Sequence, residues 1–223
     1  MQQTIQLTSA IDQFNFNALY RAPEGDVQGS VIILQEIYGL DPYIQRDVDR
    51  WANLGYHALA PSMFDRVERG YVGEHDAAGT QLGVQHLNSV GNDNPIADIQ
   101  ACIDWLADRG PVYIVGYCYG GTQAWRAAAL TQGLTAAVCY YGGGIRSAIH
   151  CQPACPVICH FGEQDPYVDA ATNQQLLAQH HPDVAVFIYP ESGHGFNNEG
   201  PTSAPADVAL ARQRTVEFFQ QFA

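Results

Sequence analysis

The chain has 223 residues, of which 47% are hydrophobic and only 15% are charged, so it can bury a sizeable core. Its formal net charge of −13, from 23 acidic and 10 basic residues, disfavours nucleic acid or an anionic membrane surface as a partner. The first residues carry no basic region and no apolar run, and no segment approaches the roughly 20 apolar residues of a membrane helix. We therefore expect a cytoplasmic protein, a monomer or a homodimer, that acts on a small molecule.

Six cysteines invite a disulfide interpretation, but a chain that can bury its own core and lacks a secretion signal is expected to keep them reduced. Cys151, Cys155 and Cys159 are spaced by four residues, yet Pro153 and Pro156 break any helix there. A metal site in this segment would need other ligands. We predict no metal site and no cofactor.

The first half of the chain alternates between strand and helix patterns. Phe14, Phe16, Ala18 and Tyr20 alternate with polar or smaller neighbours, which indicates an edge strand with one face open to water. A continuous apolar run is typical of a strand buried on both faces. The elements expected here are strands over 14–20, 31–34 and 56–60, a helix over 43–54, and a short helix near 76–88 within the weakly patterned segment 62–92.

In the second half, Asn94 and Pro95 form a good helix start, and apolar residues then recur at spacings of three and four. The alternation of strands and helices predicts a mostly parallel sheet with helices on both faces, in a single domain over 1–223. The further elements expected are helices over 94–106, 122–130, 170–181 and 205–222 and strands over 111–115, 136–141, 157–161 and 184–189.

The segment that joins the strand 111–115 to the helix after it carries the strongest functional signal. It reads Gly116-Tyr117-Cys118-Tyr119-Gly120-Gly121, a sharp turn with a cysteine at its centre. This is the pattern of a nucleophile elbow with cysteine in place of the usual serine. The flanking glycines are expected to adopt positive φ and so relieve crowding in the turn. The turn should lift the Cys118 thiol above the edge of the sheet.

Two further residues follow later strands at the same edge, where open α/β sheets place their sites. Asp165 comes just after the strand 157–161, and His194 comes just after the strand 184–189. The order of nucleophile, acid and histidine is that of α/β-hydrolases, which predicts that fold. A thiol needs a base to become a nucleophile, and an aspartate fixes the tautomer of that base.

Each of these residues also has a simpler interpretation. Taken alone, Cys118 would be a packed, inert thiol, His194 a surface or capping residue, and Asp165 an ordinary turn residue before Pro166. Their agreement in residue type, order and position at strand ends favours a Cys-His-Asp catalytic triad.

The chain resembles the dienelactone hydrolase (carboxymethylenebutenolidase) family over nearly its whole length. The motifs that carry the resemblance are Gln35-Glu36-Ile37-Tyr38-Gly39, the elbow, Tyr140-Tyr141-Gly142, Gly162-Glu163-Gln164-Asp165 and Gly193-His194-Gly195-Phe196. The resemblance implies that Glu36 contacts the nucleophilic thiol and helps to ionise it when substrate binds. It also implies that the backbone N–H groups of Ile37 and Tyr119 form the oxyanion hole.

The role of Glu36 agrees with its position after a buried strand. A carboxylate there costs free energy unless it is paired, so its pKa should rise, which suits a group that takes a proton from a thiol. The alternative is a solvated loop carboxylate. The helix that starts near Gly120 directs its N-terminal amides at the reacting centre.

One departure from the family pattern bears on the substrate. Members that hydrolyse dienelactone bind its carboxylate with arginines, whereas this chain has Asn198 four residues after His194 and no Arg or Lys over 70–92. Arg66 or Arg69 could substitute, although both could equally be solvated. We therefore expect a neutral, compact ester or lactone as substrate. Candidate pocket residues are Tyr38, Tyr117, Tyr119, Trp125, Phe196 and Asn198, and residues 62–92 could form a lid over them.

The predicted function is hydrolysis of small esters or lactones through an acyl-enzyme on Cys118, with neutral phosphotriesters as a speculative side activity. The alternatives are a true dienelactone hydrolase acting on an anionic lactone, a thioesterase or general esterase, and a silent binding protein that kept the fold. A redox thiol protein is disfavoured because the sequence has no Cys-x-x-Cys pair.

Overall fold

The computed structural model describes residues 1–223, and its eight strands form one sheet in the order β1-β2-β4-β3-β5-β6-β7-β8. The strands from β4 to β8 in this order run parallel, whereas β2 pairs antiparallel with both β1 and β4. This mostly parallel sheet confirms the predicted fold class. The strands are β1 (Gln3–Thr8), β2 (Asn15–Arg21), β3 (Gly29–Leu34), β4 (Tyr56–Pro61), β5 (Val112–Tyr117), β6 (Ala136–Tyr140), β7 (Val157–Gly162) and β8 (Ala185–Tyr189).

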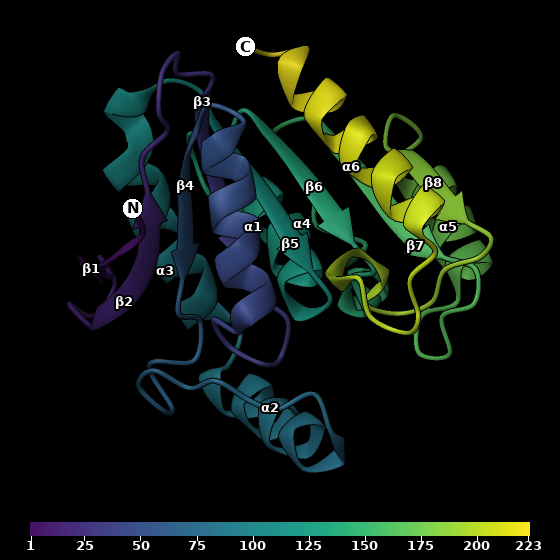
Figure 1. Cartoon of the computed structure of the whole chain (residues 1–223). Coiled ribbons are helices and arrows are strands. Elements are labelled where there is room, and N and C mark those ends of the chain that lie inside the picture. The colour runs from purple at the N-terminus through teal and green to yellow at the C-terminus, as the bar shows by residue number, and fades with distance from the viewer.

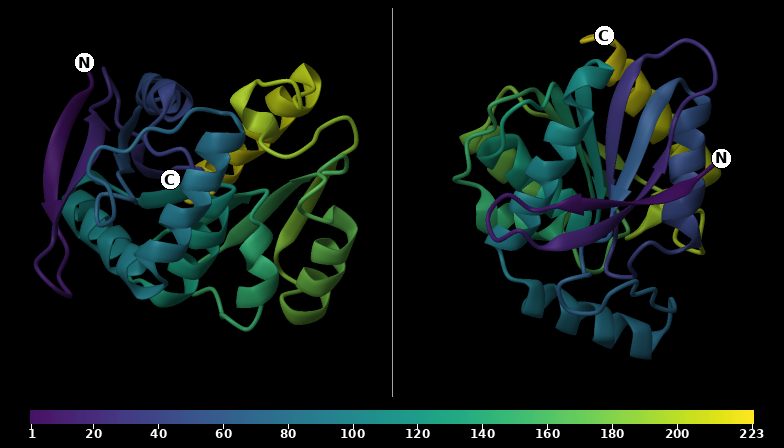
Figure 2. Two further views of the ribbon diagram at one scale, coloured as in Figure 1. Left: turned by 90° about the horizontal axis from the view of Figure 1, so that it is seen from below. Right: turned by 90° about the vertical axis from the view of Figure 1, so that its left-hand side faces the viewer.

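Helices cover both faces of the sheet, and one helix lies across its end. The helices are α1 (Pro42–Asn53), α2 (Ala77–Val90), α3 (Asp93–Leu106), α4 (Tyr119–Leu130), α5 (Ala170–His180) and α6 (Pro205–Gln220). Buried side chains of α1 and α6 share one apolar cluster, and those of α3, α4 and α5 share the other. Figure 1 shows α2 apart from both layers, below the tips of the strand arrows, and the view from below in Figure 2 shows it crossing in front of the sheet.

The strand predicted at the edge is not the edge strand. β2 has the expected alternation of buried and exposed side chains, but β1 pairs along its outer side and takes the edge position. β1 was not predicted from the sequence, because its alternating apolar pattern is limited to Ile5 and Leu7, of which only Leu7 is buried. Edge strands need little burial when backbone hydrogen bonds to a neighbour hold them.

The helix expected to start at Asn94 starts at Asp93, with Asn92 as its cap residue. Asn92 makes no side-chain capping hydrogen bond, so the cap signal at Asn94 was wrong, while Pro95 still lies in the first turn. The predicted apolar stripe is confirmed, since Ile99, Ile103 and Leu106 are buried against the sheet. None of the helices has the length and apolar character needed to cross a membrane.

The core contains one fully buried histidine that should make the fold sensitive to acid. Burial, with a smaller effect of Arg214, lowers the pKa of His160 to about 3. Its Nδ1 lies 2.8 Å from the Tyr189 hydroxyl, and its Nε2 lies 3.2 Å from the Thr215 hydroxyl. The ring is therefore neutral in the folded protein, although the unfolded chain binds a proton there below about pH 6.5.

Because the unfolded state binds more protons, the free energy of unfolding should fall as pH decreases from about 6.5 towards 4. Urea titrations at several pH values measure this slope. A His160→Asn variant should lose part of the slope whatever its absolute stability, since the titrating group is gone. An unchanged slope in that variant would show that His160 does not contribute to acid sensitivity.

Candidate active site

Cys118 joins β5 to α4 in a strained backbone conformation. Its φ of 53° and ψ of −108° lie outside the regions that a side chain adopts without cost. Two hydrogen bonds fix the turn on either side, from the Cys118 N–H to the Tyr140 carbonyl (3.0 Å) and from the Gly120 N–H to the Gln35 carbonyl (3.0 Å). The turn is thus tied to the ends of both neighbouring strands, and it places the thiol at the carboxyl edge of the sheet.

The elbow glycines were expected to adopt positive φ, and this expectation was wrong. They instead allow neighbouring backbone segments to lie close together. None of Gly116, Gly120 and Gly121 has a positive φ, whereas Cys118 does. A Cβ atom at Gly116 would lie 2.0 Å from the Gly120 carbonyl oxygen, and one at Gly120 would lie 2.4 Å from the Leu34 carbonyl oxygen. Only glycine lets these backbone segments approach so closely.

The structure brings His194 and Asp165 together at this edge. His194 Nδ1 lies 2.7 Å from Asp165 Oδ2, and the aspartate side chain is only 1% exposed. The other carboxylate oxygen, Oδ1, accepts the N–H groups of Tyr167 (2.8 Å) and Val168 (3.0 Å). A buried carboxylate with these partners holds the imidazole in one orientation and stabilises its positive charge.

The proton affinity of His194 is raised by its two partners. Burial by itself lowers the pKa of His194, but the neighbouring Asp165 and Cys118 outweigh burial and raise it to about 10. The ring is 20% exposed and so can exchange protons with solvent or substrate.

Replacing Asp165 with Asn should lower the pKa of His194, because the neutral amide no longer stabilises the imidazolium. The amide oxygen can still accept the two backbone N–H groups, so the turn should persist. A histidine-detected NMR titration measures the change, with Asp169→Asn as a control on the same side of the molecule. A pKa that stays near 10 in the Asp165→Asn protein would contradict the geometry.

Glu36 is buried at the same edge, but it faces Asn198. Burial raises the pKa of Glu36, opposed by the positive charge of His194 and by a hydrogen bond from Asn198. Asn198 Nδ2 donates to Glu36 Oε2 at 3.4 Å, and no hydrogen bond joins Glu36 to Cys118. The expected rise in pKa is therefore seen, while the contact with the thiol implied by the family resemblance is not made in this conformation.

The two backbone N–H groups expected to form an oxyanion hole lie beside Cys118. The Ile37 N–H donates no hydrogen bond within the protein, and Tyr119 is the first residue of α4, where an N–H has no partner in the helix. Both residues line the cavity that contains Cys118. The carbonyl of Ile37 lies under α2, because a Cβ atom at Gly83 would be only 2.3 Å from that oxygen.

A cavity of about 1450 Å³ opens at this edge and contains Cys118, His194 and Glu36 among its lining residues. It exceeds the roughly 300–1,000 Å³ typical of small-molecule sites, so it has room for a substrate larger than a compact ester. Residues from 72 to 92, including three side chains of α2, form one wall. Part of the segment 62–92, which was considered as a possible lid, therefore lines the cavity, and its role as a lid stays a prediction.

Only some of the predicted pocket residues line this cavity. Tyr38 and Asn198 do so, as does Tyr119. Tyr117, Trp125 and Phe196 are buried in the core and are not part of it. Tyr117 donates to Asp47 (2.7 Å) and Trp125 donates to the Ala148 carbonyl (2.9 Å), so both polar ends already have partners within the protein. An aromatic residue next to a catalytic motif is more often core than pocket, and sequence alone does not separate the two.

The arginines proposed as substitutes for the family anion site lie elsewhere. Arg66 is held by Asp12 and Asp98, and Arg69 contacts Asp65 and the Asn15 carbonyl. Two other arginines, Arg46 and Arg126, line the cavity and form no ion pair. The sequence held a signal for Arg126, because it follows Thr122 by four residues and so shares one face of the elbow helix with it. Both residues line the cavity.

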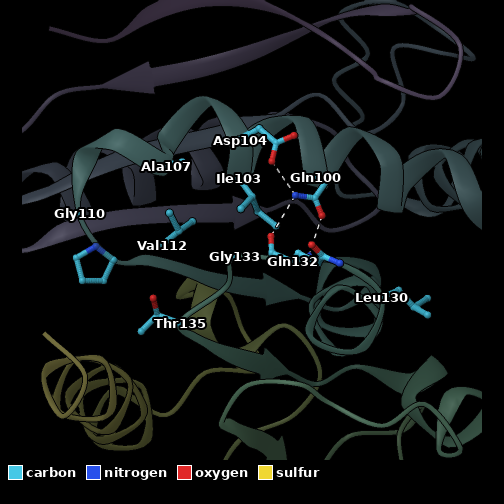
Figure 3. A pocket seen from close by; sticks show the side chains of 11 residues that line it. Gln100, Ile103, Asp104, Ala107, Gly110, Val112, Leu130, Gln132, Gly133 and Thr135 are labelled. Carbon is cyan, nitrogen blue, oxygen red and sulfur yellow. Dashed lines mark hydrogen bonds between the residues drawn. The ribbon is translucent and has the colours of Figure 1, made fainter.

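A second cavity, of about 890 Å³, lies at the opposite end of the sheet, beside the starts of β5 and β6 (Figure 3). Its side chains pair with one another. Gln100 donates to Asp104 (2.8 Å) and accepts the Gln132 N–H (2.8 Å), as the dashed lines in Figure 3 show. No histidine or cysteine lines it, in contrast to the cavity at the carboxyl edge.

The mostly parallel sheet, the elbow after β5 and the histidine after β8 define a hydrolase of the α/β class. The dienelactone hydrolase family matches residues 16–223, and the chain belongs to that family.

Relatives agree with this assignment. The carboxymethylenebutenolidase of Pseudomonas putida is 28% identical over 217 residues, which cover 93% of this chain and 92% of that protein. A presumed dienelactone hydrolase from Klebsiella pneumoniae subsp. pneumoniae superposes with a TM-score of 0.84 at 24% identity, over 100% of both chains. A dienelactone hydrolase-like promiscuous phosphotriesterase from metagenomic libraries superposes with a TM-score of 0.75 at 19% identity, over 99% of this chain and 98% of that one.

Proposed function

We propose that the protein hydrolyses small esters or lactones through a thiolate on Cys118, with His194 and Asp165 completing a catalytic triad. The observation that carries the proposal is the position of His194, which is hydrogen-bonded to Asp165 and lines the same large cavity as Cys118. A thiol, a base and a residue that orients the base are the parts that nucleophilic acyl transfer requires.

In the first step the Cys118 thiolate adds to the carbonyl carbon of the ester. The N–H groups of Ile37 and Tyr119 stabilise the oxyanion of the tetrahedral intermediate. When the intermediate collapses, the C–O bond breaks and His194 donates its proton to the leaving alkoxide. The products of this step are the alcohol and a thioester on Cys118, with neutral His194.

In the second step neutral His194 accepts a proton from a water molecule, which attacks the thioester carbonyl. The C–S bond breaks, the acid is released, and the Cys118 thiolate returns beside protonated His194. Asp165 stays ionised throughout and stabilises the imidazolium. Glu36, whose pKa is raised by burial, is proposed as the acceptor of the thiol proton when the sulfur starts in its neutral form.

Replacing Cys118 with Ala should reduce kcat on p-nitrophenyl acetate by about 10⁴-fold or more, as loss of a nucleophile does in other triads. Iodoacetamide should inactivate the enzyme with labelling at Cys118, as mass spectrometry of tryptic peptides would show. Burial raises the pKa of Cys155 to about 11, so a Cys155→Ala protein should behave as wild type. Full activity of Cys118→Ala would refute the mechanism, and an inactive wild type on all esters would favour a silent binding protein.

The proposal extends to neutral phosphotriesters as a side activity. Attack at phosphorus also places negative charge on an oxygen that two N–H groups could stabilise. The structural likeness to a protein described as a promiscuous phosphotriesterase supports including such substrates in the panel.

A second candidate substrate class is an anionic ester or lactone, and Arg126 is the observation that favours it. Arg126 lies on α4 in the cavity wall, partly buried, and its one hydrogen-bonding partner is the Asn92 side chain (3.1 Å). A guanidinium without a carboxylate partner can bind a substrate carboxylate through two parallel hydrogen bonds. This revises the preference for neutral substrates, which rested on arginines missing from the family positions.

If the substrate is anionic, Arg126→Gln should reduce kcat/KM for p-nitrophenyl hemisuccinate by about tenfold to a hundredfold, the effect expected for a charge-assisted hydrogen bond. Activity on neutral p-nitrophenyl butyrate should change little. Arg146→Gln, which removes an exposed arginine outside the cavity, serves as the control. Equal losses on both esters, or none on either, would leave neutral substrates as the proposal.

A further inference from the structure

A second pair of histidine and carboxylate opens into the same cavity as the first. His75, in the loop before α2, places its Nε2 2.6 Å from Oδ2 of Asp41, which precedes α1. Both residues line the cavity together with Glu36 and Cys118. The pair takes no part in the acyl transfer described above, and nothing in the sequence motifs pointed to it.

Asp41 fixes which nitrogen of His75 carries a proton. Its Oδ1 accepts the N–H of Ile44 at the start of α1 (2.9 Å), and its Oδ2 faces His75. A carboxylate only accepts hydrogen bonds, and the positive end of a helix favours its ionised form. The Nε2 atom must therefore hold the hydrogen, so a neutral His75 ring carries its lone pair on Nδ1.

The ring of His75 is also fixed in direction. It stacks on Tyr38 with the ring centroids 3.9 Å apart and the planes 22° apart. Tyr38 is held in turn by its hydroxyl contact with Thr80 (2.9 Å) and by the Gly73 N–H, which donates to its carbonyl (2.9 Å). Nδ1 makes no hydrogen bond within the protein, and the His75 side chain is 43% exposed.

Several acceptors line the cavity together with His75. Asp41 at the start of α1 contacts Nε2, and the lining also includes Glu36 from the β3–α1 loop and Glu74 from the same loop as His75, with Arg46 and Arg126 as its arginines. A ligand group placed here gains most if it donates hydrogen bonds. A hydroxyl group meets that requirement and is compatible with a hydrolysable ester or lactone.

We propose that His75 determines specificity by accepting at Nδ1 a hydrogen bond from a hydroxyl group of the substrate, with Asp41 as the residue that positions the ring. The proposal rests on ester hydrolysis at Cys118 and deepens it, because it names hydroxyl-bearing esters or lactones as the preferred class. A site built to pair with a hydroxyl rejects an analogue that cannot donate, since a polar group is then left without a partner.

A purely structural role predicts something different. If His75 only anchors the loop that carries α2, its loss should slow all esters equally, whatever groups they carry. The test must therefore compare substrates that differ only in hydrogen-bonding capacity.

The substrates are p-nitrophenyl hexanoate and its derivatives with either a hydroxyl or a methoxy group on the second, third or last carbon of the acyl chain.

The variants are His75→Phe, which keeps the stack on Tyr38, and Asp41→Asn, which remains a good helix cap. The amide of Asp41→Asn donates to Nε2 and so moves the ring hydrogen to Nδ1. His150→Phe, at an exposed histidine outside the cavity, is the control. Assays run near pH 8.5, above the usual titration range of histidine.

Wild type should prefer at least one hydroxy ester over its methoxy counterpart by about tenfold in kcat/KM, the effect of one hydrogen bond. His75→Phe should abolish that preference and leave hexanoate within about twofold. Asp41→Asn should shift the preference towards the methoxy ester, because Nδ1 becomes a donor. No preference in wild type, or a preference that survives in His75→Phe, would overturn the inference while leaving the mechanism intact. Activity in Cys118→Ala would instead overturn the mechanism.

Discussion

The site depends on the close approach of three backbone segments around Gly120. The end of β3, the elbow and the end of β6 lie within contact distances that leave no room for a side chain at Gly116, Gly120 or Gly121. That packing holds Cys118 at a positive φ and aims its thiol into the cavity. Because the same packing places the Tyr119 N–H at the start of α4, one set of contacts positions both the proposed nucleophile and one proposed donor of the oxyanion hole.

Three buried carboxyl groups lie at the carboxyl edge of the sheet, and they differ in their partners. Asp165 faces His194 and accepts two backbone N–H groups, and Asp41 faces His75 and accepts one. Glu36 accepts only a long hydrogen bond from Asn198. Burial raises the pKa of Glu36, which favours its uptake of a proton.

Much of this arrangement could be predicted from the sequence because strand patterns and motifs are local. The apolar runs located β3, β5 and β7, and residues directly after strands located Cys118, Asp165 and His194. Contacts between distant segments could not be found in this way. The pairing of Asp41 with His75 depends on how the loop before α2 folds back onto α1, and the burial of Tyr117 and Trp125 depends on packing between layers. β1 was missed because backbone pairing, and not apolar burial, holds it in the sheet.

The close contact between Gly83 and the Ile37 carbonyl links substitutions in α2 to the position of the loop that carries Ile37. Most positions on α2 face solvent or substrate and can change with the range of compounds the enzyme accepts. Position 83 differs, because any side chain there would displace the peptide that follows the Ile37 N–H. Substitutions at many positions of α2 can therefore change the cavity wall, whereas a substitution at position 83 would also displace the segment that carries the proposed oxyanion-hole N–H of Ile37.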